Sequence, residues 1–172
     1  MLKLLIYLTI IGSGAGAGFL MARSYDNRIF HLQDLITLLK ILEAEMKYRQ
    51  DPLPVLLSKI GELSSSLAGK FFLRVCHGLK EHYSFDFYGA WAWAVSDVYS
   101  DTALLEKDKE ILSEVGIELG KTDLENQQSL FVRVFSRLEQ QVAEAEEEKR
   151  TKGKVYRSLG TAIGVLVVIV LL

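Results

Sequence analysis

Long uncharged apolar segments occupy the two ends of this chain, Leu4–Ala22 and Leu159–Leu172, and the charged positions are concentrated between them. A helix needs about 20 predominantly apolar residues to cross the hydrocarbon core of a bilayer. The first segment reaches that length, and the second approaches it when it is extended back to Tyr156, with the Arg157 side chain reaching the headgroups. We therefore predict an N-terminal transmembrane helix over residues 1–22, a central domain over 23–155 and a C-terminal transmembrane helix over 156–172.

The apolar spacing of the central region predicts an all-α fold of about six helices. Pro52 and Pro54 end the first helix, because the residue before a proline disfavours the helical conformation. Pro54 suits the first turn of the next helix, and the serines of Ser64–Ser66 predict a loop. The expected helices cover Ile29–Arg49, Pro54–Leu63, Gly69–His82, Asp86–Val98, Thr102–Val115 and a final segment that runs from Thr122 into the C-terminal span.

The first and last helices of the central region carry apolar residues at alternating steps of three and four positions, the spacing of a coiled-coil seam. The first seam is Leu32, Leu35, Leu39, Leu42 and Met46, and the last is Phe131, Phe135, Leu138, Val142 and Ala145. Each helix continues into a predicted span. We therefore expect the long first and last helices to pair antiparallel, which would bring the two spans together and leave the shorter helices as a cap at the far end.

Glycines recur at four-residue spacing in both predicted spans. They are Gly12, Gly14, Gly16 and Gly18 in the first span, and Gly160 and Gly164 in the second. Helices associate in lipid through close backbone approach, which glycine permits. Glycine is also simply frequent in membrane-spanning helices. We predict that these glycines pack the two spans against each other or against the spans of further copies, so the pattern is compatible with a homo-oligomer.

Basic residues predict the orientation in the membrane, because they favour the cytoplasmic side. Arg23 and Arg28 follow the first span and a basic cluster within Lys149–Arg157 precedes the second, whereas only Lys3 lies on the other side. The central domain is therefore predicted to be cytoplasmic, with the basic cluster at anionic lipid headgroups. The alternative is a signal peptide cleaved at Ala15–Ala17. The protein would then be a membrane-tethered helical binding domain outside the cytoplasm.

Composition narrows the function further. With 172 residues, the chain is long enough for one hydrophobic core between its apolar ends. A net charge of −2 argues against nucleic-acid binding, which needs a concentrated basic surface. Cys76 is the only cysteine, and His77 and His82 lie about 140° apart around a helix, so neither predicts a metal site. The sequence contains no catalytic motif, and we predict a non-enzymatic protein without cofactor or metal.

Two groups of side chains are candidates for binding a protein partner. The densest aromatic stretch contains Trp91 and Trp93. Such a cluster forms either the core of a small helical domain or the centre of an interface. Glu43, Glu45 and Arg49 form either a solvated helix face or a docking face. The sequence leaves both alternatives open for both groups.

Four stretches of the sequence occur together in one order. They are Leu2–Leu5 with the glycine-rich first span and Tyr25, Leu42–Tyr48 followed by Pro52–Pro54, Gly116–Asp123 with Gln127, and Tyr156–Gly160 at the start of the last span. In this combination the chain resembles the stage III sporulation protein AB family of endospore-forming bacteria over essentially its whole length. One departure is Lys121-Thr122, where many relatives have a serine after the second glycine of that stretch.

The resemblance implies a function that the periodicity does not. The family is similar to the inner-membrane platform protein of type II secretion and type IV pilus machines, and it belongs to an envelope-spanning, secretion-like complex between mother cell and forespore. By resemblance, the chain lies in the mother-cell membrane facing the forespore. Its implied partners are membrane lipid, a cytoplasmic secretion-type ATPase and the other membrane subunits of the complex. We therefore expect a platform or adaptor subunit whose cytoplasmic domain docks the ATPase.

Overall fold

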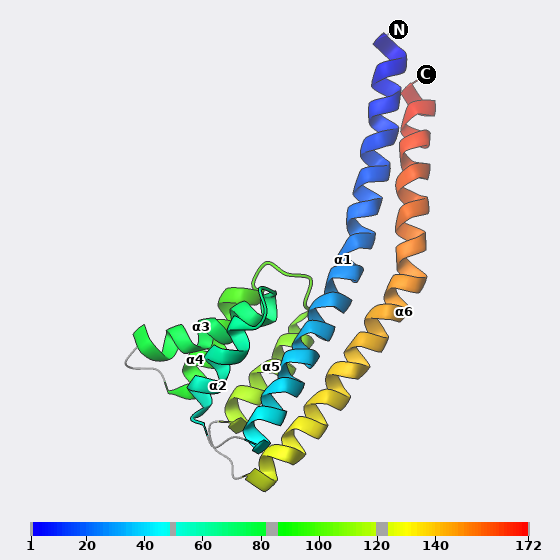
Figure 1. The fold of residues 1–172 in the computed structure, drawn as a ribbon. Coiled ribbons are helices and arrows are strands. Elements are labelled where there is room, and N and C mark those ends of the chain that lie inside the picture. The colour runs from blue at the N-terminus through cyan, green and yellow to red at the C-terminus, as the bar shows by residue number, and fades with distance from the viewer. Residues whose placement is uncertain (1, 49–50, 82–85, 120–123, 172) are drawn as a thin grey trace. The chain divides into compact units, whose positions relative to one another are not determined.

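The computed structural model describes residues 2–48, 51–81, 86–119 and 124–171. Within these ranges, it leaves the side chains of 2–15, 17–18, 21, 124–126, 153–154, 156–161, 163–167 and 170–171 undescribed. The described chain is all-α, as predicted, and forms six helices (Figure 1). They are α1 (Leu2–Tyr48), α2 (Leu53–Glu62), α3 (Leu67–Glu81), α4 (Phe87–Tyr99), α5 (Glu106–Leu119) and α6 (Leu124–Leu171).

The chain divides into two compact units, each considered by itself. The paired-helix unit comprises Met1–Ile29 and Ala143–Leu172, and the helical domain comprises Phe30–Val142. Helices α1 and α6 contribute a part to each unit, whereas α2, α3, α4 and α5 belong entirely to the helical domain. The described candidate partner-binding residues, Glu43 and Glu45 of α1 and Trp91 and Trp93 of α4, therefore lie in the helical domain.

Ion pairs join α1 and α6 in the paired-helix unit and fix their relative direction. Lys149 Nζ lies 2.6 Å from Asp26 Oδ1, and Arg28 Nη1 lies 3.2 Å from Glu148 Oε2. Residue numbers rise along one helix as they fall along the other, so the two helices are antiparallel, as predicted (Figure 1). Only 2% of Arg28 is exposed. A buried guanidinium needs such a carboxylate, because desolvation of an unpaired charge is costly.

The predicted membrane spans lie mostly where side chains are not described. No helix in the described part of the chain has a segment that is both long and apolar enough to cross a membrane. The predicted spans, 1–22 and 156–172, fall largely outside the described side chains, as do the predicted packing glycines Gly12, Gly14, Gly18, Gly160 and Gly164. Gly16 is described and exposed, and a Cβ atom placed on it would meet nothing within 4 Å.

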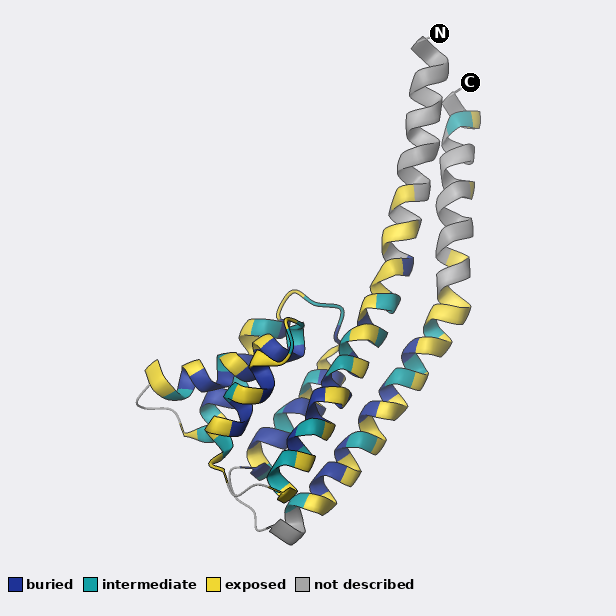
Figure 2. Ribbon diagram, in the orientation of Figure 1, coloured by how far each residue is buried: buried dark blue, intermediate teal, exposed yellow. Residues whose placement is uncertain are grey.

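One hydrophobic core holds the helical domain together and receives side chains from all six helices. Figure 2 shows buried residues on the sides of the helices that face the interior of this domain. The first seam predicted from the sequence is buried, with Met46 packed at its edge. From the second seam, Phe131 and Leu138 are buried, and Phe135 and Val142 pack against the core. Both rows of apolar residues therefore contribute to the same core, except for Ala145, which is buried within the paired-helix unit.

Side-chain caps set the ends of the shorter helices. The Asp86 carboxylate accepts a hydrogen bond from Gly89 N at 2.7 Å, so α4 begins directly after Asp86. The helix predicted from Thr102 instead begins at Glu106 and continues past Val115 to Leu119. Its start is fixed by Asp108, whose carboxylate accepts a hydrogen bond from Leu105 N at 2.8 Å. The expected N-terminus was therefore wrong by one turn, because the buried Asp108 binds the backbone N–H of Leu105, the residue just before the helix.

Candidate functional site

Trp91 lies in the core of the helical domain and is fully buried. Its indole Nε1 donates a hydrogen bond to the backbone oxygen of Leu112 at 2.7 Å, and its ring lies edge-on to Phe71, with 4.9 Å between ring centroids. Helix α5 can pass this close because residue 116 is glycine: a Cβ atom there would lie 2.4 Å from Trp91 Cδ1. This burial places Trp91 in the core of the helical domain, which is one of the two alternatives that the sequence left open.

Trp93 is partly exposed and anchors an ordered group of side chains from α3 and α4. The Arg74 guanidinium lies over its indole ring, 4.2 Å from the centroid, and the His77 ring stacks at 6.3 Å. Asp97 Oδ2 holds Arg74 Nε at 2.8 Å. Tryptophan and arginine are enriched among the residues that contribute most to protein interfaces. Trp93 therefore stays a candidate for partner binding, with its ring orientation fixed by its neighbours.

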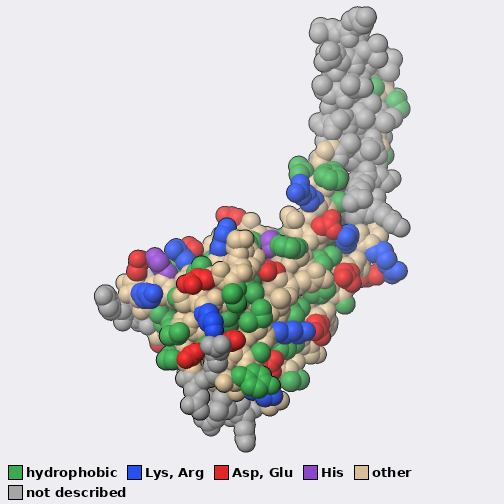
Figure 3. Space-filling model, viewed as in Figure 1, with side chains coloured by type: hydrophobic (Ala, Val, Ile, Leu, Met, Phe, Trp, Pro, Cys, Tyr) green, Lys and Arg blue, Asp and Glu red, His purple; other side chains and the backbone are tan. Residues whose placement is uncertain are grey.

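The candidate docking face on α1 is partly accessible. Glu43 and Glu45 are partly exposed, and Glu45 Oε2 lies 3.6 Å from Lys59 Nζ on α2. Arg49 lies outside the described residues. On the face of the helical domain in Figure 3, acidic and basic side chains are interspersed. Glu43 and Glu45 are therefore accessible acidic groups, and Glu45 has a basic neighbour in Lys59.

The surroundings of Cys76 and His31 favour a structural role for both side chains. No three His, Cys, Asp or Glu side chains among the described residues come together in a way that could hold a metal ion. The buried Cys76 thiol donates a hydrogen bond to the carbonyl oxygen of Pro54 at 3.4 Å, and burial raises the pKa of this thiol. The thiolate, which is the nucleophilic form, is therefore disfavoured. Burial also lowers the pKa of His31, against the opposing charge of Asp34, so its imidazole is neutral at pH 7.

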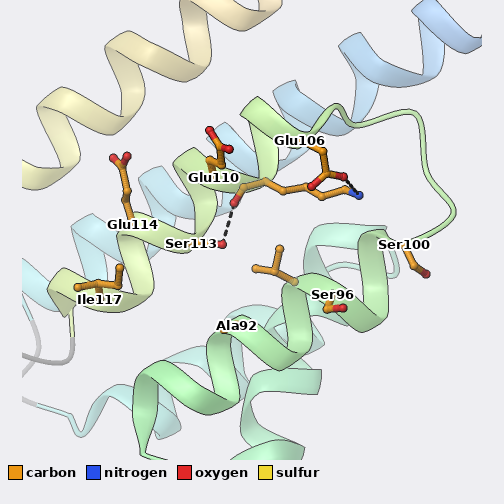
Figure 4. A pocket seen from close by; sticks show the side chains of 10 residues that line it. Ala92, Ser96, Ser100, Glu106, Glu110, Ser113, Glu114 and Ile117 are labelled. Carbon is orange, nitrogen blue, oxygen red and sulfur yellow. Dashed lines mark hydrogen bonds and ion pairs between the residues drawn. The ribbon is translucent and has the colours of Figure 1, made fainter.

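An open groove of about 650 Å³ lies between α4 and α5 (Figure 4). Its α4 side consists of small side chains at four-residue spacing, Ala92, Ser96 and Ser100, beside Val95. Side chains this small leave room for another backbone to approach closely. Ser100 donates a hydrogen bond to the carbonyl oxygen of Asp97 at 3.4 Å, which keeps its hydroxyl close to its own helix.

Two rows of side chains on α5 form the other side of this groove. The inner row is Lys109, Ser113 and Ile117, and the outer row is Glu106, Glu110 and Glu114. In Figure 4, Ser113 points toward α4, whereas Glu110 and Glu114 point away from it. Lys109 Nζ binds Glu106 Oε1 at 2.8 Å, and 37% of Ile117 is exposed. The groove therefore has a floor of small, partly apolar side chains and an acidic edge that the glutamates of α5 form.

Sequence reasoning did not identify this groove. One signal was present, because the glutamates of α5 recur every four residues and therefore share one face of the helix. The sequence alone does not reveal which helix lies beside that face. The small residues of α4 carry no functional signal either, because alanine and serine at helical spacing are equally compatible with a solvated surface.

Three comparisons with known proteins agree. The family model for Stage III sporulation protein AB matches residues 3–172. Stage III sporulation protein AB of Bacillus subtilis (strain 168) is 28% identical over 172 residues, and the match covers 100% of both chains. A solved structure of a Stage III sporulation protein AB is 25% identical and superposes with a TM-score of 0.66, covering 73% of this chain and 98% of the solved one. The solved structure therefore shares the fold of this chain over the part that it covers.

Proposed function

This chain belongs to the Stage III sporulation protein AB family, which gives it a role related to sporulation, and on that premise we propose a more specific function. The protein is a non-enzymatic membrane platform or adaptor subunit of a sporulation-specific, secretion-like complex between mother cell and forespore. Its helical domain faces the cytoplasm and docks a secretion-type ATPase. The likeness to secretion platforms is an analogy of fold, and function depends on the surfaces of this particular chain.

The observation that carries the proposal is the apolar surface of the paired-helix unit. Phe19 is 55% exposed, Leu20 67%, Val155 52% and Ile169 66%. Hydration of such side chains costs about 25 cal/mol for each Å² of apolar surface, and a bilayer removes that cost. Phe19, Leu20 and Ile169 lie in the segments that the sequence predicts to span the membrane, and Val155 directly precedes the second of these segments. Lipid is therefore the environment that suits this surface.

Exposed basic residues next to these apolar positions support the same placement. Arg23 is exposed, and the side chains of Lys149, Arg150 and Lys152 are 49%, 74% and 53% exposed. Basic side chains just inside a span favour the cytoplasmic leaflet and its anionic headgroups. Arg28 does not take part, because it is buried against Glu148. The charge distribution supports a helical domain on the cytoplasmic side.

Membrane topology is the first test. We expect a protease site inserted at the exposed Ser65, between α2 and α3, to be protected in intact protoplasts that express the full chain and to be cut after lysis. Mass spectrometry should find Met1 or Leu2 at the mature N-terminus. Cleavage in intact protoplasts, or an N-terminus near Ala17, would replace this proposal with a tethered binding domain outside the cytoplasm. Unchanged tryptophan fluorescence of the inserted variant verifies its fold.

Docking of the ATPase gives the second prediction. Glu43→Lys combined with Glu45→Lys should lower co-purification of the secretion-type ATPase with the full chain by at least about tenfold, because reversing interface charges replaces attraction by repulsion. The matched control is Glu62→Lys combined with Glu81→Lys, which makes the same change of net charge at exposed sites on α2 and α3. ATPase recovery that is equal in the two double variants would remove Glu43 and Glu45 from the docking face.

A further inference from the structure

An acidic row runs along α5, and only part of it is paired with another helix. Glu106, Glu110, Glu114 and Glu118 follow one another at four-residue spacing. Within the helical domain, two arginines of α6 at the same spacing form ion pairs with the last two of these glutamates. Arg133 Nη2 lies 2.7 Å from Glu118 Oε1, and Arg137 Nη1 pairs with Glu114. The domain thus already contains one example in which a helix with basic residues four apart binds this row.

Among the described side chains, no basic residue of a neighbouring helix pairs with the other half of the row. One turn beyond Arg137, α6 carries Gln141, which is uncharged. Among the described residues, the Glu110 carboxylate forms no ion pair or hydrogen bond. Within the described part of the chain, Glu106 pairs with Lys109 of its own helix, and 83% of its side chain is exposed. Glu106 and Glu110 therefore form an acidic edge that is open to solvent at the α4–α5 groove.

The groove beside this edge is as long as a short helix. From Glu106 to Ile117, α5 is about 16 Å long at a rise of 1.5 Å per residue, which corresponds to about three turns. Ala92, Ser96 and Ser100 present a ridge of small side chains at four-residue spacing on the opposite side. Helices pack by placing ridges of this spacing into the grooves of their neighbours. The small ridge allows the backbone of an added helix to lie close to α4.

We propose that the α4–α5 groove binds an amphipathic helix of another protein subunit, with Lys or Arg residues four apart facing Glu106 and Glu110 and small apolar residues facing Ala92 and Ser96. Charge complementarity identifies this occupant: the lining holds three glutamates and a single lysine, and among the described residues Glu110 has no cationic partner, whereas Glu106 pairs with Lys109 and Glu114 with Arg137. The basic residues would extend the pattern that Arg133 and Arg137 begin. The inference rests on the proposed function only in taking the occupant from the same complex.

Site-specific crosslinking in sporulating cells tests this proposal on the full chain. A benzophenone amino acid replaces the exposed Ser96, and another replaces Ser65 outside the groove as the control position. We expect the Ser96 position alone to crosslink a protein segment with basic residues four apart, identified by mass spectrometry of the joined peptide. Glu106→Lys with Glu110→Lys should lower the yield at least about tenfold. The matched variant Glu62→Lys with Glu81→Lys should leave the yield within about twofold of the parent.

A reciprocal exchange makes the test specific. Replacing the basic residues of the captured segment by Glu should restore crosslinking to the Glu106→Lys, Glu110→Lys variant. The proposal is overturned by an absent product at Ser96, by a product with lipid or a second copy, or by a captured segment without basic residues at that spacing. Equal yields from the two double variants, both with native tryptophan fluorescence, also overturn it.

The two proposals fail in different ways in the same cells. If the Ser96 product survives but the ATPase does not co-purify with any form of the chain, the ATPase-docking function fails and the groove assignment stands. If the Ser96 product is absent while the ATPase still co-purifies, only the groove assignment fails. Co-purification and crosslinking are therefore measured on the same preparation.

Discussion

Replacing Trp91 with alanine should lower the free energy of unfolding of the helical domain by about 4 kcal/mol, whereas Trp93→Ala should lower it by about 1 kcal/mol or less. Truncation of a large buried aromatic side chain typically costs 3–5 kcal/mol, because burial and packing are lost and a cavity remains. Trp91 is fully buried and Trp93 is partly exposed. Typical domains are stable by only 5–15 kcal/mol, so the first substitution removes a large share of the stability.

Three features make Trp91 sensitive to replacement. Its ring contacts Phe71 edge-on at 4.9 Å, and Phe87 and Phe72 at 5.6 and 6.2 Å between centroids. Its Nε1 has a hydrogen-bond partner inside the core, Leu112 O. Helix α5 packs against the indole at Gly116, so replacing Trp91 with alanine would leave an empty volume between α4 and α5. Trp91→Phe should cost less, about 1–2 kcal/mol, because most of the packing remains.

Urea unfolding of the full chain in detergent, followed by tryptophan fluorescence, measures both effects. The chain has two tryptophans, and both lie in the helical domain, so fluorescence reports on that unit alone. In each single variant the remaining tryptophan reports the transition. Comparable losses of stability for Trp91→Ala and Trp93→Ala would contradict the assignment of one residue to the core and the other to the surface. Dynamic light scattering excludes aggregation as the source of any shift.

Trp91 and Trp93 also illustrate what the sequence could and could not predict. The two residues lie two positions apart in one aromatic stretch. Side chains two positions apart in a helix point in directions that differ by about 200° around the helix axis. The stretch therefore had to place one tryptophan inward and the other outward, but its composition did not say which. Tertiary contacts determine which tryptophan is buried: Gly116 lies against Trp91, and Arg74 of α3 lies against Trp93. Neither neighbour is near in sequence.

The elements that the sequence predicted correctly are those with local causes. The seams of α1 and α6 follow from regular apolar spacing, and the start of α4 follows from a capping aspartate at residue 86. The α4–α5 groove follows from no local pattern, because it depends on how two helices lie beside each other. Glu106 and Glu110 carry the same chemistry as Glu114 and Glu118, and the position of α6 decides which two of them pair with its arginines.

Gly69 should be the least replaceable described glycine, and Gly69→Ala should cost about 2–3 kcal/mol. A Cβ atom on Gly69 would lie 2.0 Å from the backbone oxygen of Ser64 and 3.0 Å from that of Gly61. Both obstacles are backbone atoms, so α2 and α3 would have to separate. Alanine recovers about 1 kcal/mol of helix propensity, which does not offset overpacking of this kind.

The same fluorescence-detected unfolding, applied to a series of glycine-to-alanine variants, tests the steric cause. Gly61→Ala should cost less than Gly69→Ala, because its nearest obstacle is the flexible Leu73 side chain at 2.7 Å. Gly16→Ala should leave the transition unchanged, because a Cβ atom there meets nothing within 4 Å and Gly16 lies in the other unit. The expected order of cost is therefore Gly69, Gly61, Gly16. If Gly69→Ala unfolds at the parent's urea concentration, the close approach of α2 and α3 does not limit the stability of this domain.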